Sequence, residues 1–106
     1  MMAFSFITEI DGHRALAVNR GAVSSNFFKS LWDPDQYDLM IAFCWKHGQW
    51  RVSLYSDKEG IDVGNIAKSY GGGGHKGASG FQCERLPFAL PRDSERPRKP
   101  EKSGIV

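Results

Sequence analysis

The sequence contains no long apolar run, and this absence excludes a membrane-spanning helix, which needs about 20 mostly apolar residues. Cysteine is scarce: only Cys44 and Cys83 are present, and we expect free thiols in strands rather than a disulfide. The amino-terminal segment lacks the basic start and apolar stretch of a secretory signal. We therefore expect a cytoplasmic protein without a membrane partner.

Clusters of metal-binding side chains are also missing. The chain has no Asp-His-His string, and its closest group of aspartates, Asp33, Asp35 and Asp38, surrounds a proline turn without a nearby histidine. Cys44 and His47 would supply only two of the four ligands of a structural zinc site. The sequence therefore predicts no metal site and no catalytic residue, and we expect no enzymatic activity from this chain alone.

Positive charge is concentrated at one end of the chain. Residues 91–106 contain five basic and three acidic side chains, which leaves nine of each in residues 1–90. Prolines recur among the charges of this end, a composition typical of a disordered tail. We therefore predict a domain over 1–90 and a disordered tail over 91–106. A neutral domain suits a local site for one or a few nucleotides better than a long duplex.

Hydrophobic spacing predicts a small single α/β domain, with a mixed sheet of about five strands and two helices packed on it. The first 20 residues read as two short strands around Asp11-Gly12. Ser24 is a candidate cap for a first helix that ends before residues 33–35. A second helix is predicted to begin after a cap at Asp62 and to end at Gly71.

The clearest strand signal covers residues 37–56. It predicts a β-hairpin that turns at residues 47–49 and buries an aromatic-rich face. The side chains assigned to this face are Tyr37, Leu39, Ile41, Phe43, Trp45, Trp50, Val52 and Leu54. A last strand is predicted over residues 78–86.

Four consecutive glycines, residues 71–74, precede His75 and Lys76. A helix stop accounts for one of these glycines, and each of the others costs backbone entropy on folding. They indicate backbone conformations that residues with a side chain do not adopt, or a ligand that lies against the main chain. Such a loop can turn several N–H groups inward as an anion-binding nest, with His75 and Lys76 as donors at its rim. We expect Gly73 and Gly74 to accept a β-carbon without loss of the fold but with loss of ligand.

Three segments together carry a resemblance: RVSLYS at 51–56, IDVGNIAK at 61–68 and GGGGHKGASGF at 71–81. They resemble the DHH-associated domain, which follows the catalytic domain in DHH-family phosphoesterases such as RecJ-type exonucleases and oligoribonucleotide-hydrolysing enzymes. In that family the domain closes over the substrate, and the GGGGH loop contacts the phosphate or nucleotide. The resemblance therefore implies substrate contacts at Gly72, Gly73, Gly74 and His75.

One position departs from the family pattern. The family commonly has Arg-Ser where this chain has Tyr55-Ser56, so an arginine that would pair with phosphate is missing. Arg51 lies on the same predicted strand face as Tyr55 and could supply part of this charge. Tyr55 itself is either a ring on which a base stacks or a partly buried aromatic of the sheet. Ser56 and Lys76 complete the predicted phosphate-binding set.

The sequence therefore predicts a nucleotide- or nucleic-acid-binding domain of a DHH-type phosphoesterase. Its expected partners are a nucleotide or short single-stranded nucleic acid and a DHH catalytic domain in cis or in trans. No cofactor is expected in this chain, and manganese or magnesium only in that separate domain; no oligomeric state is assigned. Three alternatives remain: an assembly-only remnant, part of an enzyme for a non-nucleotide phosphoester or polyphosphate, and an enzyme using His75 as general acid or base. The last lacks a paired carboxylate or metal to generate a nucleophile.

Overall fold

The computed structural model describes residues 5–21 and 25–91, so the predicted Ser24 cap and all of the predicted tail except Pro91 lie outside it. Within these ranges the chain forms two helices and six strands. In chain order they are β1 (Ser5–Ile10), β2 (His13–Asn19), α1 (Ser25–Leu31), β3 (Leu39–Lys46), β4 (Gln49–Tyr55), α2 (Val63–Ser69), β5 (Gly73–Gly74) and β6 (Ala78–Cys83).

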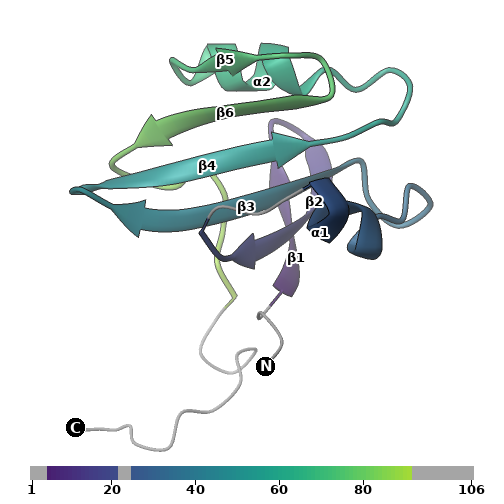
Figure 1. The fold of residues 1–106 in the computed structure, drawn as a ribbon, viewed down its shortest axis with the longest axis horizontal. Helices are drawn as coiled ribbons and strands as arrows, with labels where there is room; N and C mark the ends of the chain where they lie inside the picture. The colour runs from purple at the N-terminus through teal and green to yellow at the C-terminus, as the bar shows by residue number, and fades with distance from the viewer. Residues whose placement is uncertain (1–4, 22–24, 92–106) are drawn as a thin grey trace, which may run out of the picture.

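All six strands form one mixed sheet in the order β1-β2-β3-β4-β6-β5 (Figure 1). Strands β2 and β3 are parallel, and the segment between them contains α1. The other neighbouring strands are antiparallel. The predicted α/β class and the two helices are confirmed. The strand beyond the expected five is β5, whose two glycines the sequence had assigned to a loop.

Each helix covers a different face of the sheet. Side chains of β2 and β3 alternate between two core clusters, as they must in strands where successive residues point to opposite faces. Ala15, Ala17 and Leu39 pack in one cluster with Val63, Ile66 and Ala67 of α2. Val18, Met40 and Ala42 pack in the other with Phe28 of α1. The centre of the sheet is therefore buried on both sides.

The predicted buried face of the long hairpin is wrong at two positions. Tyr37 precedes β3 and packs in the α1 cluster, with its ring 5.6 Å from that of Trp32. Trp45 lies near the hairpin end and is 57% exposed. Strand β3 is buried on both faces along its first five residues, so its alternation does not divide core from solvent as the sequence suggested.

Local signals predicted the ends of α2 and two turns correctly. The Asp62 carboxylate accepts a hydrogen bond from the Asn65 N–H at 3.0 Å, which caps the helix. Gly71 has a φ of +90° and ends it. The residues at both hairpin turns, Asp11-Gly12 and His47-Gly48, have positive φ, as two-residue turns between twisted strands require. The last strand ends at Cys83, earlier than predicted.

Candidate functional site

The predicted glycine loop forms a tight hairpin at the edge of the sheet. We call residues 71–80 the glycine hairpin. In it β5 pairs with β6, so that Gly73 lies opposite Gly80 and Gly74 opposite Ser79. The His75 N–H donates to the Ala78 carbonyl at 2.7 Å, and the Ala78 N–H donates back at 3.3 Å. The segment is therefore held by strand pairing and is not an open loop.

Two neighbouring elements fix the turn of the glycine hairpin. The Val63 N–H at the start of α2 donates to the Lys76 carbonyl, and the Ser56 N–H donates to the Gly77 carbonyl, both at 3.0 Å. A Cβ on Gly64 would lie 2.9 Å from the His75 carbonyl oxygen, so α2 packs directly against this backbone. The His75 and Lys76 side chains remain exposed. The fold thus presents both side chains from a backbone of fixed position.

The four glycines differ in why they lack a side chain. Gly71 has a left-handed φ, and a Cβ on Gly72 would overlap the Gly80 carbonyl oxygen and lie 2.5 Å from Phe81 Cβ. Gly74 has a φ of +145°, and its Cβ would lie 2.6 Å from Ser79 Cα. The expectation that Gly74 accepts a side chain without loss of the fold is therefore wrong. A Cβ on Gly73 would meet nothing within 4 Å, and this glycine has no positive φ.

Two of the glycine amides are used by the end of α2. The Gly71 N–H donates to the Lys68 carbonyl at 3.0 Å, and the Gly72 N–H donates to the Ala67 carbonyl at 2.8 Å. This pair of bonds is a Schellman motif, so the Gly71 and Gly72 amides already have hydrogen-bond partners within the domain. His75 and Ala78 form a hydrogen-bonded pair next to the β5–β6 ladder. Hydrogen-bonded and non-hydrogen-bonded pairs alternate along an antiparallel ladder, so Gly74 and Ser79 form a non-hydrogen-bonded pair. The Gly74 N–H therefore points away from β6.

A hollow of about 440 Å³ lies beside the glycine hairpin and brings Arg51 and Gly72 together. Arg51 and Gln82 are paired across β4 and β6, and Ser53 is paired with Gly80. Arg51 and Ser53 are exposed, since the core cluster under α1 reaches only as far as Tyr55 on this face of β4. The hollow therefore combines a cation and two polar side chains with a floor of glycine backbone. The sequence did not single out Ser53 or Gln82 as site residues.

Ser56 and Lys76 line a different hollow, of about 360 Å³. The Ser56 side chain is buried, and its hydroxyl donates to the Asp38 carbonyl at 2.7 Å and accepts from the Lys58 N–H at 3.1 Å. Both hydrogen bonds hold strand and loop backbones together. The structure thus places Ser56 in the architecture beneath the hairpin turn, while Lys76 is exposed.

A charged cluster that the sequence did not reveal lies next to Ser56. The Asp38 carboxylate lies 2.7 Å from Lys58 Nζ and 3.6 Å from His13 Nδ1. The hydrogen bond from Lys58 is the main reason why the pKa of Asp38 lies below its usual value. These residues come from three separate segments, so no spacing in the sequence marks them as neighbours.

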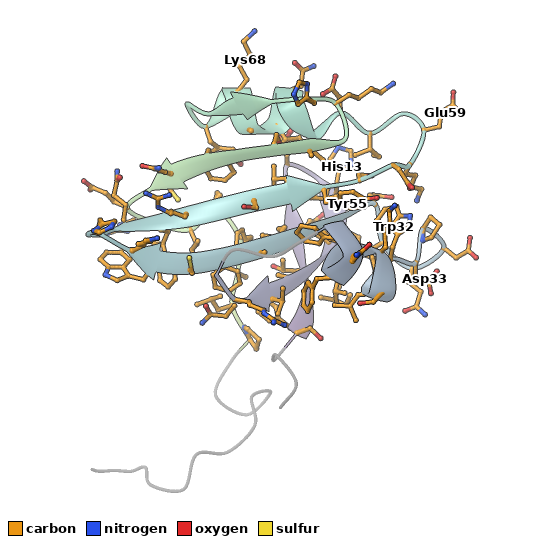
Figure 2. All side chains as sticks on the ribbon, in the orientation of Figure 1. His13, Trp32, Asp33, Tyr55, Glu59 and Lys68 are labelled. Carbon is orange, nitrogen blue, oxygen red and sulfur yellow. The ribbon has the colours of Figure 1, made fainter. Side chains whose placement is uncertain are left out.

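Tyr55 packs against aromatic side chains of the α1 region (Figure 2). Its ring stacks on that of Phe28 at 5.2 Å with an interplanar angle of 5°, and the ring of Trp32 meets it edge-on at 5.9 Å. One face of the Tyr55 ring is therefore already covered. Of the two interpretations drawn from the sequence, this geometry favours a partly buried aromatic of the sheet over a free platform for a base.

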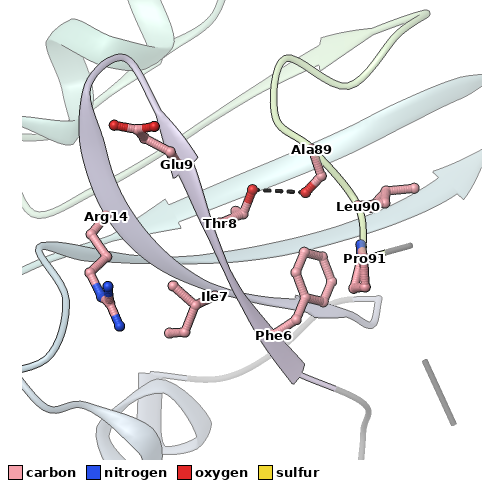
Figure 3. Close-up of a pocket in the computed structure, with 8 residues that line it drawn as sticks. All are labelled: Phe6, Ile7, Thr8, Glu9, Arg14, Ala89, Leu90 and Pro91. Carbon is pink, nitrogen blue, oxygen red and sulfur yellow. Dashed lines mark hydrogen bonds between the residues drawn. The ribbon is translucent and has the colours of Figure 1, made fainter. Parts of the chain in front are cut away.

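Another hollow, of about 690 Å³, lies at the opposite edge of the sheet along β1 (Figure 3). The Thr8 hydroxyl there donates to the Ala89 carbonyl at 2.7 Å and ties the segment after β6 to this edge. None of the predicted site residues line it. Its lining residues are Phe6, Ile7, Thr8, Glu9, Arg14, Ala89, Leu90 and Pro91.

Among residues 5–21 and 25–91, no three or more His, Cys, Asp or Glu side chains gather as metal ligands would. In the same ranges, neither helix is long and apolar enough to cross a membrane.

A mixed six-stranded sheet with two helices, and a glycine hairpin that follows the second helix at the sheet edge, define a compact α/β domain. The chain belongs to the DHHA1 domain family, whose model matches residues 12–92. DHHA1 is the DHH-associated domain of DHH phosphoesterases, and membership of this family implies association with a DHH domain. Strand β1 lies before the matched region. A comparison with curated proteins finds no match.

Proposed function

We propose that this domain binds a nucleotide or a short single-stranded nucleic acid for a DHH phosphoesterase and holds a phosphate at the glycine hairpin. The observation that carries the proposal is Gly73. Its three glycine neighbours are required by backbone conformation or by close packing, whereas a side chain on Gly73 would point into open space. A ligand that lies against the main chain gives a physical reason for a glycine at this position.

The donors around Gly73 suit a phosphate. The Gly74 N–H points outward from the sheet edge, and the adjacent His75 and Lys76 side chains are exposed. Hydrogen bonds from charged donors to phosphate oxygens are about twice as strong as neutral ones. Arg51, in the hollow beside Gly72, supplies part of the charge that the family arginine would give at position 55.

In this proposal the domain grips the substrate and a separate DHH domain hydrolyses it. Manganese or magnesium belongs to that catalytic domain. The glycine floor of the hollow, with Arg51, Ser53 and Gln82 above it, lets a nucleoside approach the backbone closely.

The test is calorimetric titration of the 106-residue chain with 5′-mononucleotides and short 5′-phosphorylated oligonucleotides. Gly73→Val should melt like the parent, because its side chain meets no neighbour, but should bind at least about tenfold more weakly. Gly21→Val is the matched control, since a Cβ there makes only an ordinary contact with Cys44 Sγ at 4.0 Å. Parent-like binding by Gly73→Val, or a parent that binds none of these ligands, would overturn the proposal.

A further inference from the structure

Strand β1 forms the edge of the sheet that lies opposite the glycine hairpin (Figure 1). Its pairing with β2 is continuous from Ser5 to Ile10 and contains no bulge. The tight turn after β1 makes Ile10 and His13 a hydrogen-bonded pair, and such pairs alternate with non-hydrogen-bonded ones along an antiparallel ladder. The backbone N–H and C=O groups of Ser5, Ile7 and Glu9 therefore point away from β2.

The bonding of the neighbouring segments agrees with this alternation. Arg14 is paired with Glu9, and its carbonyl is turned to the other side of β2, where it accepts from the Asp38 N–H at 2.7 Å. The segment after β6 comes near β1 but is tied to it through a side chain, the Thr8 hydroxyl that donates to the Ala89 carbonyl (Figure 3). Within residues 5–21 and 25–91, no hydrogen bond joins the outward backbone groups of β1 to another segment. A sheet edge with a row of unpaired N–H and C=O groups can pair with another strand.

Apolar side chains are also exposed at this edge. Of the four large exposed apolar side chains among the described residues, two line the hollow of about 690 Å³ along β1: Ile7, which is 43% exposed, and Leu90, which is 42% exposed. Strand β1 contains neither lysine nor proline, the residues that commonly protect an edge strand from pairing. The edge is therefore open to an extended chain in both its backbone and its side chains.

The sequence of β1 is complementary to itself in one antiparallel register. When Ile7 lies opposite the Ile7 of a second copy, Ser5 of each copy lies opposite Glu9 of the other. Every outward backbone group of these residues then has a partner, because each such pair exchanges both N–H···O bonds. The three side chains share the α1 side of the sheet, since Ile7 is paired with Leu16 of the α1 cluster. The two Ile7 side chains can therefore cover each other, and each Ser5 hydroxyl can donate to a Glu9 carboxylate.

The single charge of β1 selects this register. A pairing centred on Glu9 would bring two carboxylates directly opposite each other, which is destabilising. The pairing centred on Ile7 separates the carboxylates and gives each a hydroxyl donor. This charge complementarity favours a second copy of the chain as the occupant of the edge.

We propose that two copies of this chain pair through β1, antiparallel and around a two-fold axis at Ile7, so that their sheets become continuous. Such a contact uses the same surface on both copies and is closed by its symmetry. One pair of short strands buries less than the roughly 1,600 Å² of a typical stable interface, so the dimer forms at high protein concentration and dissociates on dilution. The inference does not depend on the proposed function, because both glycine hairpins stay free at the outer edges of the joined sheet.

Sedimentation velocity of the 106-residue chain over a range of concentrations tests the proposal. The parent should change from monomer to dimer as the concentration rises. Ile7→Pro should melt near the parent but dimerise at least about tenfold more weakly, because proline removes an outward N–H that pairing with β2 does not use. Ile7→Lys, which keeps the backbone N–H, should also weaken the dimer by placing two like charges opposite each other. Leu31→Lys is the matched control, since Leu31 is 36% exposed on α1, and should dimerise like the parent.

Oxidation of Ile7→Cys tests the register. In the proposed dimer the two Cα atoms of residue 7 lie about 5.5 Å apart, which is within the range of a disulfide. This variant should become a covalent dimer under mild oxidation, whereas the parent, with only Cys44 and Cys83, should not.

Three results would overturn the inference. A parent that stays monomeric at every concentration shows that β1 does not pair with a second copy. A dimer that survives both Ile7→Pro and Ile7→Lys uses another surface. Loss of the dimer in Leu31→Lys, with the dimer kept in the two Ile7 variants, places the contact at α1.

Discussion

Gly72 and Gly80 come so close across the edge of the sheet that a β-carbon on Gly72 would overlap the carbonyl oxygen of Gly80. The next residue along the chain, Gly73, has open space where a β-carbon would lie. The fold therefore requires a glycine at position 72, whereas we attribute the glycine at position 73 to the proposed ligand.

Gly72→Ala should lower the free energy of unfolding by about 1–3 kcal/mol, because the new methyl group must push apart two paired segments of backbone. Gly73→Ala should change it by less than about 0.5 kcal/mol, as an exposed substitution does. Urea denaturation of the two variants measures the difference. Equal losses of stability would show that the close approach at Gly72 is not rigid.

The Asp38–Lys58 pair should make the free energy of unfolding depend on pH in the acid range. The hydrogen bond from Lys58 lowers the pKa of Asp38 in the folded state, so the stability that the pair contributes is present above pH about 4. It is lost as the pH falls further, through the folded-state value. Urea denaturation from pH 7 to 2.5 should therefore show Lys58→Met less stable than the parent at neutral pH and equal to it in strong acid. Lys68→Met, on the exposed side of α2, should follow the parent at every pH.

Tyr55→Arg should lower the stability of the domain and add positive charge at the proposed phosphate site. It removes the stack on Phe28, and aromatic pairs contribute about 0.5–1.5 kcal/mol beyond the area that they bury. It also restores the arginine that the family commonly has, so affinity for 5′-phosphorylated ligands should rise and depend more steeply on salt. Thermal melts and titrations at several salt concentrations test the two effects separately. An affinity that responds to neither the substitution nor the salt would remove position 55 from the site.

His75→Ala should weaken mononucleotide binding by roughly 1.5–3 kcal/mol, the range for a hydrogen bond to a charged group. His47→Ala, at the turn between β3 and β4, is the control and should bind mononucleotides like the parent. A His75→Ala variant with parent-like affinity would remove His75 from the phosphate site.

What could be predicted from the sequence were features that depend on residues close together in the chain. The Asp62 cap, the Gly71 stop and the turns at Asp11-Gly12 and His47-Gly48 each follow from the local chemistry of one or two residues. The paired glycines of β5 could not be foreseen, since two residues carry no periodicity and their partner strand comes later.

Burial and site geometry were harder to predict because they depend on distant segments. The alternation of residues 37–45 suggested one buried face, but only the position of β3 at the centre of the sheet determines that both faces are covered. In the same way, the family resemblance implied contacts at Gly72–His75 without revealing that the Gly72 amide closes α2. Phe28, which occupies one face of Tyr55, comes from a helix far upstream.

The single parallel pairing among the described strands, β2 with β3, divides the sheet into two contiguous stretches of chain. Residues 39–83 contain four strands and α2 with short connections, so this part can assemble by local steps. The β1–β2 hairpin must instead find its place after closure of the longer loop through α1. In hydrogen-exchange experiments, amides of β1 should therefore open first, while those of β4 and β6 should exchange only when the whole domain unfolds.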